Sequence, residues 1–343
     1  MMNRLFWISM LLMSLVGCAN KPLKFSVQNT QIKQVWPDSG EMPRYRYIGE
    51  LDGEVFDQET PQKDWLKWTV GLIQGEPLPK KMTRPYDVFV DEQEKVYVAD
   101  LGLPGIFVYD FQKKELEVWK NIDGQPLFTA PVAMAEVRGE IWVADADRAE
   151  ILRFDKQGQL LGRFGEGVLN RPNGLAFDPI TQTVYVTDSR DHKIKRFNPK
   201  GKMVGEIGER GEAVGEFNFP TAISFKNGLL YVSDSMNARV QILDRDGQPQ
   251  NAFGYRGLNV GNTPRPKGIA VDSDHNVYVV ESYYGYLLVY DQQGRFLLPV
   301  SAKNTPISEF YLPAGVTVDQ KNRVYVADMF NGRVVMLQYL GAE

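Results

Sequence analysis

The sequence contains few of the residues that build metal and redox sites. Its 343 residues include one Cys and two His, which excludes a disulfide framework and any site made of several thiolates or imidazoles. An excess of positive charge is also missing. The formal net charge is −4, whereas a nucleic-acid-binding face must be basic to neutralise phosphates. We therefore expect no nucleic acid among the partners of this protein.

What the chain has in abundance indicates a folded, β-rich protein. Hydrophobic residues make up 43% and charged residues 24% of the sequence, a balance typical of globular domains rather than disordered ones. Aromatic residues reach 12%, and the 31 Gly residues favour turns. Strands joined by tight turns are therefore expected.

Residues 1–17 have the pattern of a secretory signal peptide. A positive charge at Arg4 precedes an apolar run over residues 5–16, which is shorter than the ~20 residues that a membrane-spanning helix requires. The run ends in Leu15-Val16-Gly17-Cys18, which resembles the lipobox of bacterial lipoproteins. This resemblance implies cleavage before Cys18, acylation with chains such as palmitate, and a lipidated tether over residues 18–43. The alternative is an ordinary signal peptide followed by an incidental Cys.

The residue after the Cys adds a prediction about location. In bacterial lipoproteins an Asp at that position favours retention at the inner membrane, and here the residue is Ala19. The resemblance therefore implies a lipid anchor in the bacterial outer membrane, with the protein facing the periplasm or the cell surface. Several acyl chains anchor a protein stably, whereas a single chain binds a membrane only marginally.

One pattern recurs six times along the chain. It consists of a Pro, a short apolar strand, a polar turn, and an alternating strand that ends in an acid, at residues 85–100, 131–145, 172–188, 220–234, 266–281 and 313–328. The acids stand 45, 43, 46, 47 and 47 residues apart, which is too regular to arise by chance. Each copy continues with two further strands joined by turns such as Asp155-Lys-Gln-Gly158.

Four antiparallel strands in a repeat of this length are typical of a β-propeller blade, so we predict an all-β, six-bladed β-propeller over residues 44–343. The sixth repeat supplies only three strands, which would leave an exposed sheet edge. The segment Arg44-Tyr-Arg-Tyr-Ile-Gly-Glu50 has the pattern of a fourth strand. We expect it to complete the sixth blade and close the ring.

The residues after the acids carry a resemblance to a known family. Asp234-Ser-Met-Asn237-Ala-Arg239 and Asp328-Met-Phe-Asn331-Gly-Arg333 resemble the motif of NHL-repeat propellers, and Asp188-Ser-Arg-Asp191-His-Lys193 resembles it loosely. The opening Val35-Trp-Pro37 is similar to a bacterial lipoprotein subgroup of these propellers. The resemblance implies a six-bladed fold over about residues 44–340. It does not specify a function, because NHL propellers include binding scaffolds and a few enzymes.

One insertion interrupts the strand pattern before the first blade. Thr60-Pro61 is typical of a helix start, Trp65, Trp68 and Leu72 fall on one helical face, and Gly75 ends the segment. The sequence therefore predicts a short helix over about residues 61–74. It either packs on the flank of the propeller, caps the channel, or docks a partner.

Strand directions in a propeller bring two sets of loops to one face, which we call the upper face. These are the loops that follow each acid and the loops that precede each Pro. The acids Asp100, Asp145, Asp188, Asp234, Glu281 and Asp328 would form a ring near this face, where a carboxylate usually accepts backbone N–H bonds. Asp100 and Glu281 lack the Arg or Lys that follows five residues later in the family motif, so they are the candidates for ligand contact.

Arginines precede the Pro in alternate blades, at Arg84, Arg171 and Arg265. On a sixfold ring they would lie about 120° apart, and converging guanidinium groups suit carboxylates or phosphates. The alternative is that each Arg pairs with a neighbouring acid.

Other side chains of the upper loops are apolar, among them Tyr283, Tyr284 and Phe330, and clustered exposed aromatic residues often mark interfaces. The alternative is that the predicted helix covers them. Asp87 and Asn173 are weak candidates for holding a hard cation such as Ca²⁺ by oxygen ligands. Apart from that ion we expect no cofactor.

No catalytic constellation is evident, because His192 and His275 are predicted on opposite faces and cannot share a metal. The sequence therefore favours a membrane-anchored binding or scaffold module of the cell envelope, with an envelope protein, peptide or glycan bound on the upper face. The alternative is a metal-dependent lyase or hydrolase with its site in the channel.

Overall fold

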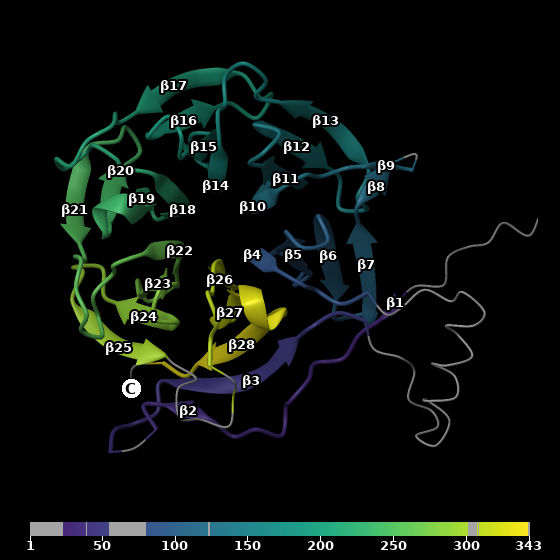
Figure 1. Ribbon diagram of the computed structural model, residues 1–343, viewed down its shortest axis with the longest axis vertical. Coiled ribbons are helices and arrows are strands. Elements are labelled where there is room, and N and C mark those ends of the chain that lie inside the picture. Colours follow the sequence, from purple (N-terminus) through teal and green to yellow (C-terminus); the bar gives the residue numbers. More distant parts are fainter. Residues whose placement is uncertain are drawn as a thin grey trace, which may run out of the picture.

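The protein is a closed ring of six β-sheets around a central channel (Figure 1). The structure, a computed structural model, describes residues 23–38, 40–54, 80–122, 124–300, 307 and 309–341. Within these residues each sheet has four antiparallel strands, and two sheets gain a short fifth strand. The prediction of an all-β, six-bladed propeller is confirmed.

Each blade runs from an inner strand beside the channel to an outer strand at the rim. Blade one comprises β4 (Pro85–Val90), β5 (Val96–Asp100), β6 (Gly105–Asp110) and β7 (Glu115–Trp119), and blade two β10 (Pro131–Val137), β11 (Glu140–Asp145), β12 (Glu150–Phe154) and β13 (Leu160–Phe164). Blade three comprises β14 (Pro172–Asp178), β15 (Thr183–Asp188), β16 (Lys193–Phe197) and β17 (Met203–Ile207), and blade four β18 (Pro220–Lys226), β19 (Leu229–Asp234), β20 (Arg239–Asp244) and β21 (Pro249–Phe253). Blade five comprises β22 (Pro266–Val271), β23 (Val277–Glu281), β24 (Tyr286–Tyr290) and β25 (Phe296–Val300), and blade six β26 (Val316–Val318), β27 (Arg323–Asp328), β28 (Arg333–Tyr339) and β3 (Tyr45–Leu51). A small hairpin, β8 (Asn121–Ile122) and β9 (Gln125–Pro126), follows blade one.

The second strand of every blade is buried on both faces. In β5, for example, all five residues from Val96 to Asp100 are buried, because each sheet packs between two neighbouring sheets. β-branched and aromatic residues fill this position well. The described residues form six hydrophobic clusters, each between two adjacent blades.

The ring closes where the sequence predicts. Strand β3 pairs antiparallel with β28, from Leu51 opposite Val334 to Tyr45 opposite Tyr339. A buried ion pair joins the same two strands, with 2.8 Å between Nη1 of Arg333 and Oε2 of Glu50. Residues from the two ends of the propeller sequence therefore share one blade, so the ring cannot open without breaking a sheet.

The segment predicted as a tether packs on the propeller wherever it is described, which corrects that part of the prediction. Strand β1 (Leu23–Lys24) adds to the edge of β7 in blade one, and β2 (Val35–Trp36) adds to β3 in blade six. The physical reason is an apolar alternation within a largely polar segment. Phe25 lies 5.0 Å from the ring of Tyr109 and is buried, as is Trp36.

Two further predictions fall outside the described residues. They are the signal peptide with the lipidated Cys18, and the helix expected over residues 61–74. Among the helices of the described residues, none has the length and apolar character needed to cross a membrane.

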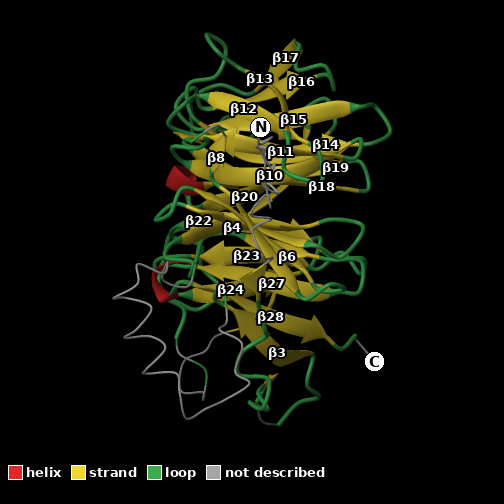
Figure 2. Ribbon diagram, turned by 90° about the vertical axis from the view of Figure 1, so that its right-hand side faces the viewer, coloured by secondary structure: helices red, strands yellow, loops and turns green. Residues whose placement is uncertain are grey.

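The two kinds of loop expected on the upper face do meet there. The 3-10 helices η1 (Ser235–Asn237) and η2 (Met329–Asn331), which follow second strands, lie on the same face of the ring (Figure 2). The backbone N–H of Arg84, in a loop that precedes an inner strand, donates to the carboxylate of Asp100 at the end of a second strand. The remaining hairpin turns form the lower face.

Candidate functional site

The six acids of the repeat hold the upper loops together. All six are fully buried, and each accepts backbone N–H groups from the loop before the inner strand of its own blade. Burial raises the pKa of Asp234, Glu281 and Asp328. These carboxylates therefore support the loops on which a site can be built.

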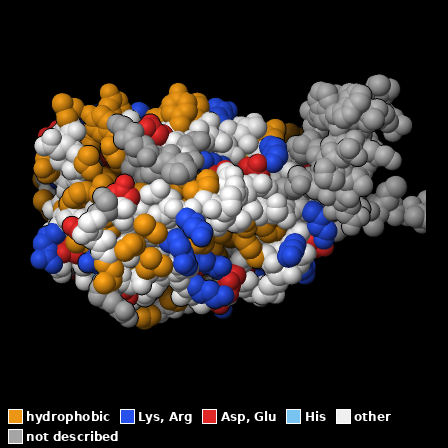
Figure 3. Space-filling model, turned by 90° about the horizontal axis from the view of Figure 1, so that it is seen from below, with side chains coloured by type: hydrophobic (Ala, Val, Ile, Leu, Met, Phe, Trp, Pro, Cys, Tyr) orange, Lys and Arg blue, Asp and Glu red, His pale blue; other side chains and the backbone are white. Residues whose placement is uncertain are grey.

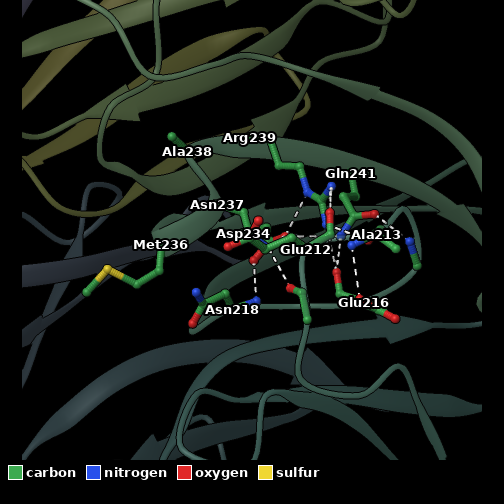
Figure 4. Close-up of polar contacts among 12 residues, drawn as sticks. Glu212, Ala213, Glu216, Asn218, Asp234, Met236, Asn237, Ala238, Arg239 and Gln241 are labelled. Atoms are coloured by element: carbon green, nitrogen blue, oxygen red, sulfur yellow. Dashed lines mark hydrogen bonds and ion pairs between the residues drawn. The ribbon is translucent and has the colours of Figure 1, made fainter.

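The Asp-x-x-Asn-x-Arg motif extends this support in blade four (Figure 4). Oδ2 of Asp234 accepts from Nδ2 of Asn237 and from Nε of Arg239, both at 2.8 Å. Arg239 also donates to the carbonyl oxygens of Glu212, Ala213 and Glu216. The motif residues hold a loop in place rather than presenting charge to solvent.

Asp100 and Glu281, the acids predicted to contact ligand, are satisfied in the same way. Asp100 accepts from four backbone N–H groups, at Thr83, Arg84, Gly102 and Leu103. Glu281 accepts from the backbone of Arg265, Tyr283 and Tyr284. Neither carboxylate lines the two cavities described next, and nothing in their geometry supports ligand contact.

A cavity of about 740 Å³ opens at the upper mouth of the channel between blades one, three, four and five. Its lining gathers five cationic side chains, from Arg171, Arg190, Arg256, Arg265 and Lys267. Among the described residues that line it there is no Asp or Glu. Apolar and aromatic walls complete it, from Tyr86, Phe219, Met236, Pro264 and Tyr283.

Most of these cations have little compensating negative charge. Nη1 of Arg171 lies 2.9 Å from Asp147, and Nη2 of Arg256 donates to the carbonyl oxygen of Met236. Arg190, Arg265 and Lys267 form no ion pair with any residue that the structure describes. The mouth is therefore a positive region in a chain whose net charge is −4.

Lys267 is the deepest of the five cations. Its Nζ lies 5.1 Å from the centre of the Tyr86 ring, a cation–π contact. Burial lowers the pKa of Lys267 to about 8, and the charge of Arg265 acts in the same direction. Burial also raises the pKa of Tyr86, so that phenol stays protonated.

The residues that follow the inner-strand prolines form a ring, which we call the neck. In blades one to five the pairing of the inner and second strands shifts register just after the Pro, as in a β-bulge, which re-aims the side chain that follows. The six neck residues are Tyr86, Val132, Asn173, Thr221, Lys267 and Ala314. All six line a second cavity of about 850 Å³ below, and Tyr86, Asn173, Thr221 and Lys267 line both cavities.

The neck contains an unsatisfied polar group. Asn173 is only 8% exposed, and its side-chain oxygen has no hydrogen-bond partner. Buried amide oxygens are normally paired, because an unpaired one loses its bonds to water without replacement. Asn173 therefore offers a hydrogen-bonding position to whatever enters the neck.

Below the neck lies Asp87, the other residue considered for a metal. Its Oδ2 accepts from the backbone N–H of Met134 at 2.9 Å, and burial raises its pKa to about 7. Asp87 and Asn173 both line the lower cavity. No group of three or more His, Cys, Asp or Glu suited to a metal occurs among the described residues. The Ca²⁺ hypothesis therefore still depends on these two ligands and remains a prediction.

The predicted triad of arginines is only partly brought together. Arg171 and Arg265 line the upper cavity, but Arg84 does not, and its Nη2 points to the carbonyl oxygen of Leu101 at 3.4 Å. Of the predicted aromatic residues, Tyr283 lines the cavity and is 63% exposed, with Tyr284 edge-on against it. Phe330 lies apart, packed on Tyr311. Figure 3 shows the outer edge of the ring, where several exposed hydrophobic side chains lie beside charged ones.

Among the residues of the cavity that sequence reasoning missed are Tyr86, Arg190, Arg256 and Lys267. Two of them occupy the position after the inner-strand Pro, and that shared position is the signal that points to them. Arg190 lies two residues after the acid of blade three, the repeat position that Met236 and Tyr283 occupy in the next two blades. Arg256 lies in an upper loop whose length differs among blades, so no repeat position marks it.

Comparison with known proteins agrees with the architecture. The NHL repeat profile matches residues 310–335, within blade six. No curated protein sequence matches the chain. Auxiliary nutrient binding proteins from Bacteroides ovatus and Bacteroides thetaiotaomicron are similar in structure, with TM-scores of 0.57 and 0.59, 14% and 11% identity, 75% and 76% of this chain covered, and 69% and 70% of theirs.

An inactive variant of virginiamycin B lyase from Staphylococcus aureus is also similar. Its TM-score is 0.55 at 16% identity, over 75% of this chain and 96% of that one. Identities this low establish a common fold only. Six repeats and a closed ring of blades show that the chain is a six-bladed β-propeller, and its sixth blade matches the NHL repeat.

Proposed function

We propose that the protein is a binding module of the bacterial cell envelope, anchored by lipid on Cys18, and that its ligand is an anion bound in the upper cavity. One observation carries the proposal. Five cationic side chains line this cavity, no described lining residue is acidic, and three of the cations form no ion pair with a described residue. Small-ligand sites are usually concave, with apolar and aromatic walls and a few convergent polar groups, and this cavity has aromatic walls together with its cations.

Two considerations support the binding role over the alternative of a metal-dependent lyase or hydrolase. Similar structures include auxiliary nutrient binding proteins, although the likeness is one of fold. The cavity also offers donors and positive charge rather than a nucleophile or a general base in contact with one another. Element analysis of the purified protein tests the alternative directly, because a stoichiometric divalent metal would favour it.

Arg265 and Arg84 allow a matched test of the anion site. Both precede the Pro of an inner strand and both are exposed, but only Arg265 lines the cavity. In the full-length protein we expect inorganic phosphate to raise the melting temperature, since a ligand that binds only the folded state stabilises it. Arg265→Glu should abolish this rise and Arg84→Glu should preserve it. Equal responses of the two variants would contradict the proposal.

Anchoring is tested separately. Cys18→Ser should move the protein from the membrane fraction to the soluble fraction, because the acyl chains supply the membrane affinity. Ala19→Asp should keep the protein in membranes but shift it from the outer to the inner membrane. A Cys18→Ser variant that remains in the outer membrane would show that lipid is not the anchor.

A further inference from the structure

We propose that the upper cavity is built for an elongated, hydroxylated ligand with an anionic group at each end, such as a sugar diacid. The leading anionic group would enter the neck beside Lys267 and Asn173, and the trailing group would meet the arginines of the rim. This inference rests on the proposed function. It further specifies that the ligand has two anionic groups and that the chain between them carries hydroxyl groups.

The depth of the cations separates two binding positions. Lys267 lines both the upper and the lower cavity, so it lies at the neck where the two meet. Arg190, Arg256 and Arg265 line the upper cavity alone and are exposed. The positive charge is therefore divided between the floor and the rim of one cavity, which suits two anionic groups better than one.

The neck can bind a small anionic group such as a carboxylate or a phosphate. The three N–H donors of Lys267 contact no acceptor among the described residues, and its ammonium group rests on the Tyr86 ring. Arg265 is the charged group that acts on the Lys267 ammonium, and it repels it. An entering carboxylate or phosphate would supply both the missing acceptor and the missing negative charge.

Asn173 points to a hydroxyl group next to that head. Its side-chain oxygen is buried and unpartnered, so it needs a donor, which a carboxylate does not have and a hydroxyl does. Exchange of the amide oxygen and nitrogen would leave a buried donor, which a hydroxyl also satisfies. A hydroxyl beside the leading anionic group fits either orientation.

The rim position suits a second anionic group. Guanidinium groups bind carboxylates and phosphates through paired N–H donors, and Arg190 and Arg265 have no described ion-pair partner. Arg256 is held by the carbonyl oxygen of Met236 and keeps its remaining donors available. Phe219 and Tyr283 form walls of the same cavity, where the carbon chain of a sugar acid can pack.

Three six-carbon probes separate charge from hydroxyl content. D-Glucarate has two carboxylates and four hydroxyls, D-gluconate has one carboxylate, and adipate has two carboxylates without hydroxyls. Titration calorimetry on the full-length protein in detergent at pH 7 and low salt measures each affinity. We expect glucarate to bind about tenfold more tightly than gluconate, which lacks the second carboxylate, and than adipate, which lacks the hydroxyls, because one further hydrogen bond supplies about this factor.

Variants assign the effect to the neck. Lys267→Met should bring glucarate down to the affinity of gluconate, and Asn173→Ala should bring it down to the affinity of adipate. Arg84→Glu serves as the surface control and should leave all three affinities unchanged. Unfolding curves confirm that each variant is folded, and the two neck variants test the same site independently.

The outcomes distinguish failure of the two-charge inference from failure of the proposed anion site. Equal binding of glucarate and gluconate to the unsubstituted protein, or a glucarate preference that survives Lys267→Met, overturns the two-charge inference. If phosphate still binds in an Arg265-dependent way, the proposed anion site stands in that case. If neither phosphate nor any of the three probes binds, both proposals fall.

Discussion

Lys267→Met should stabilise the protein while it removes ligand binding, because the ammonium group is held in the neck at a cost. Its pKa is lowered from 10.5 to about 8 by burial and by Arg265. At about 1.4 kcal/mol per pKa unit, the corresponding cost in the free energy of unfolding has an upper bound of about 3.5 kcal/mol. Water in the open cavity and the contact with Tyr86 reduce this cost. We expect a net gain of about 1–2 kcal/mol, or a melting temperature higher by about 2–4 °C.

The pH dependence identifies the cause of that gain. A Lys whose pKa is lower in the folded than in the unfolded state destabilises the fold fully below the folded value, and the effect vanishes above the unfolded value. The gain from Lys267→Met should therefore be complete below about pH 8 and disappear as the pH approaches 10.5. The groups that act on this ammonium are Tyr86 and Arg265, and neither is altered in the variant.

Lys156→Met is the matched control with the opposite sign. Lys156 also lines the channel, but its Nζ lies 2.8 Å from Glu136 and 3.5 Å from Asp91. Burial opposes its charge, yet these two carboxylates raise its pKa above the usual value. Its removal leaves two acids unpaired and should lower the melting temperature at pH 7. Thermal unfolding of both variants at pH 6, 8 and 10 checks the reasoning, and a Lys267→Met protein less stable than the parent at pH 6 would refute it.

Three further predictions concern the channel and the closure of the ring. Asp87→Asn should raise the free energy of unfolding by about 2 kcal/mol above pH 7 and have little effect near pH 4. Burial raises the pKa of Asp87 from 3.8 to about 7, so the cost of the Asp grows as the pH rises between these two values and is complete above the higher one. An equal effect at pH 4 and pH 8, measured by urea unfolding, would contradict it. Arg333→Ala should destabilise the protein by about 3–5 kcal/mol, since it leaves buried Glu50 and Asp328 without their shared cation, and increased hydrogen exchange in β3 is the expected signature. Gly268→Ala should destabilise blade five, because its Cβ would lie 2.5 Å from the carbonyl oxygen of Ala314, which the Gly268 N–H contacts across the blade boundary, and unchanged thermal unfolding would argue against that close approach.

The architecture was predictable because each blade repeats the same physical solution. Regular spacing of the acids gave the number of blades, and the unpaired edge of the sixth repeat indicated the strand that closes it. The structural role of the buried acids could be predicted because a carboxylate at a strand end holds the next loop, and Asp100 and Glu281, which were expected to contact ligand, hold their loops in the same way. Their roles depend on backbone geometry that every repeat shares.

The cavity was harder to predict because it depends on where the repeats differ. The neck residues Tyr86, Asn173 and Lys267 have no common chemical type, and the bulge that turns them toward the channel has no sequence signature of its own. Arg84 and Arg265 occupy equivalent repeat positions, yet only one of them faces the cavity. The prediction of a tether over residues 18–43 does not hold from Leu23 onward, because apolar residues such as Phe25 and Trp36 pack this segment against the propeller.

If Cys18 carries lipid, the pairing of β1 with β7 limits the distance between the propeller and the bilayer. Leu23 lies opposite Leu116 near the lower end of β7, and only four residues separate it from Cys18. If Cys18 carries the lipid, the chain between Cys18 and Leu23 spans about 18 Å at most. The propeller would then be attached to the membrane at its lower face, beneath blade one. The upper cavity with its arginines would face the aqueous phase, where small solutes are dissolved.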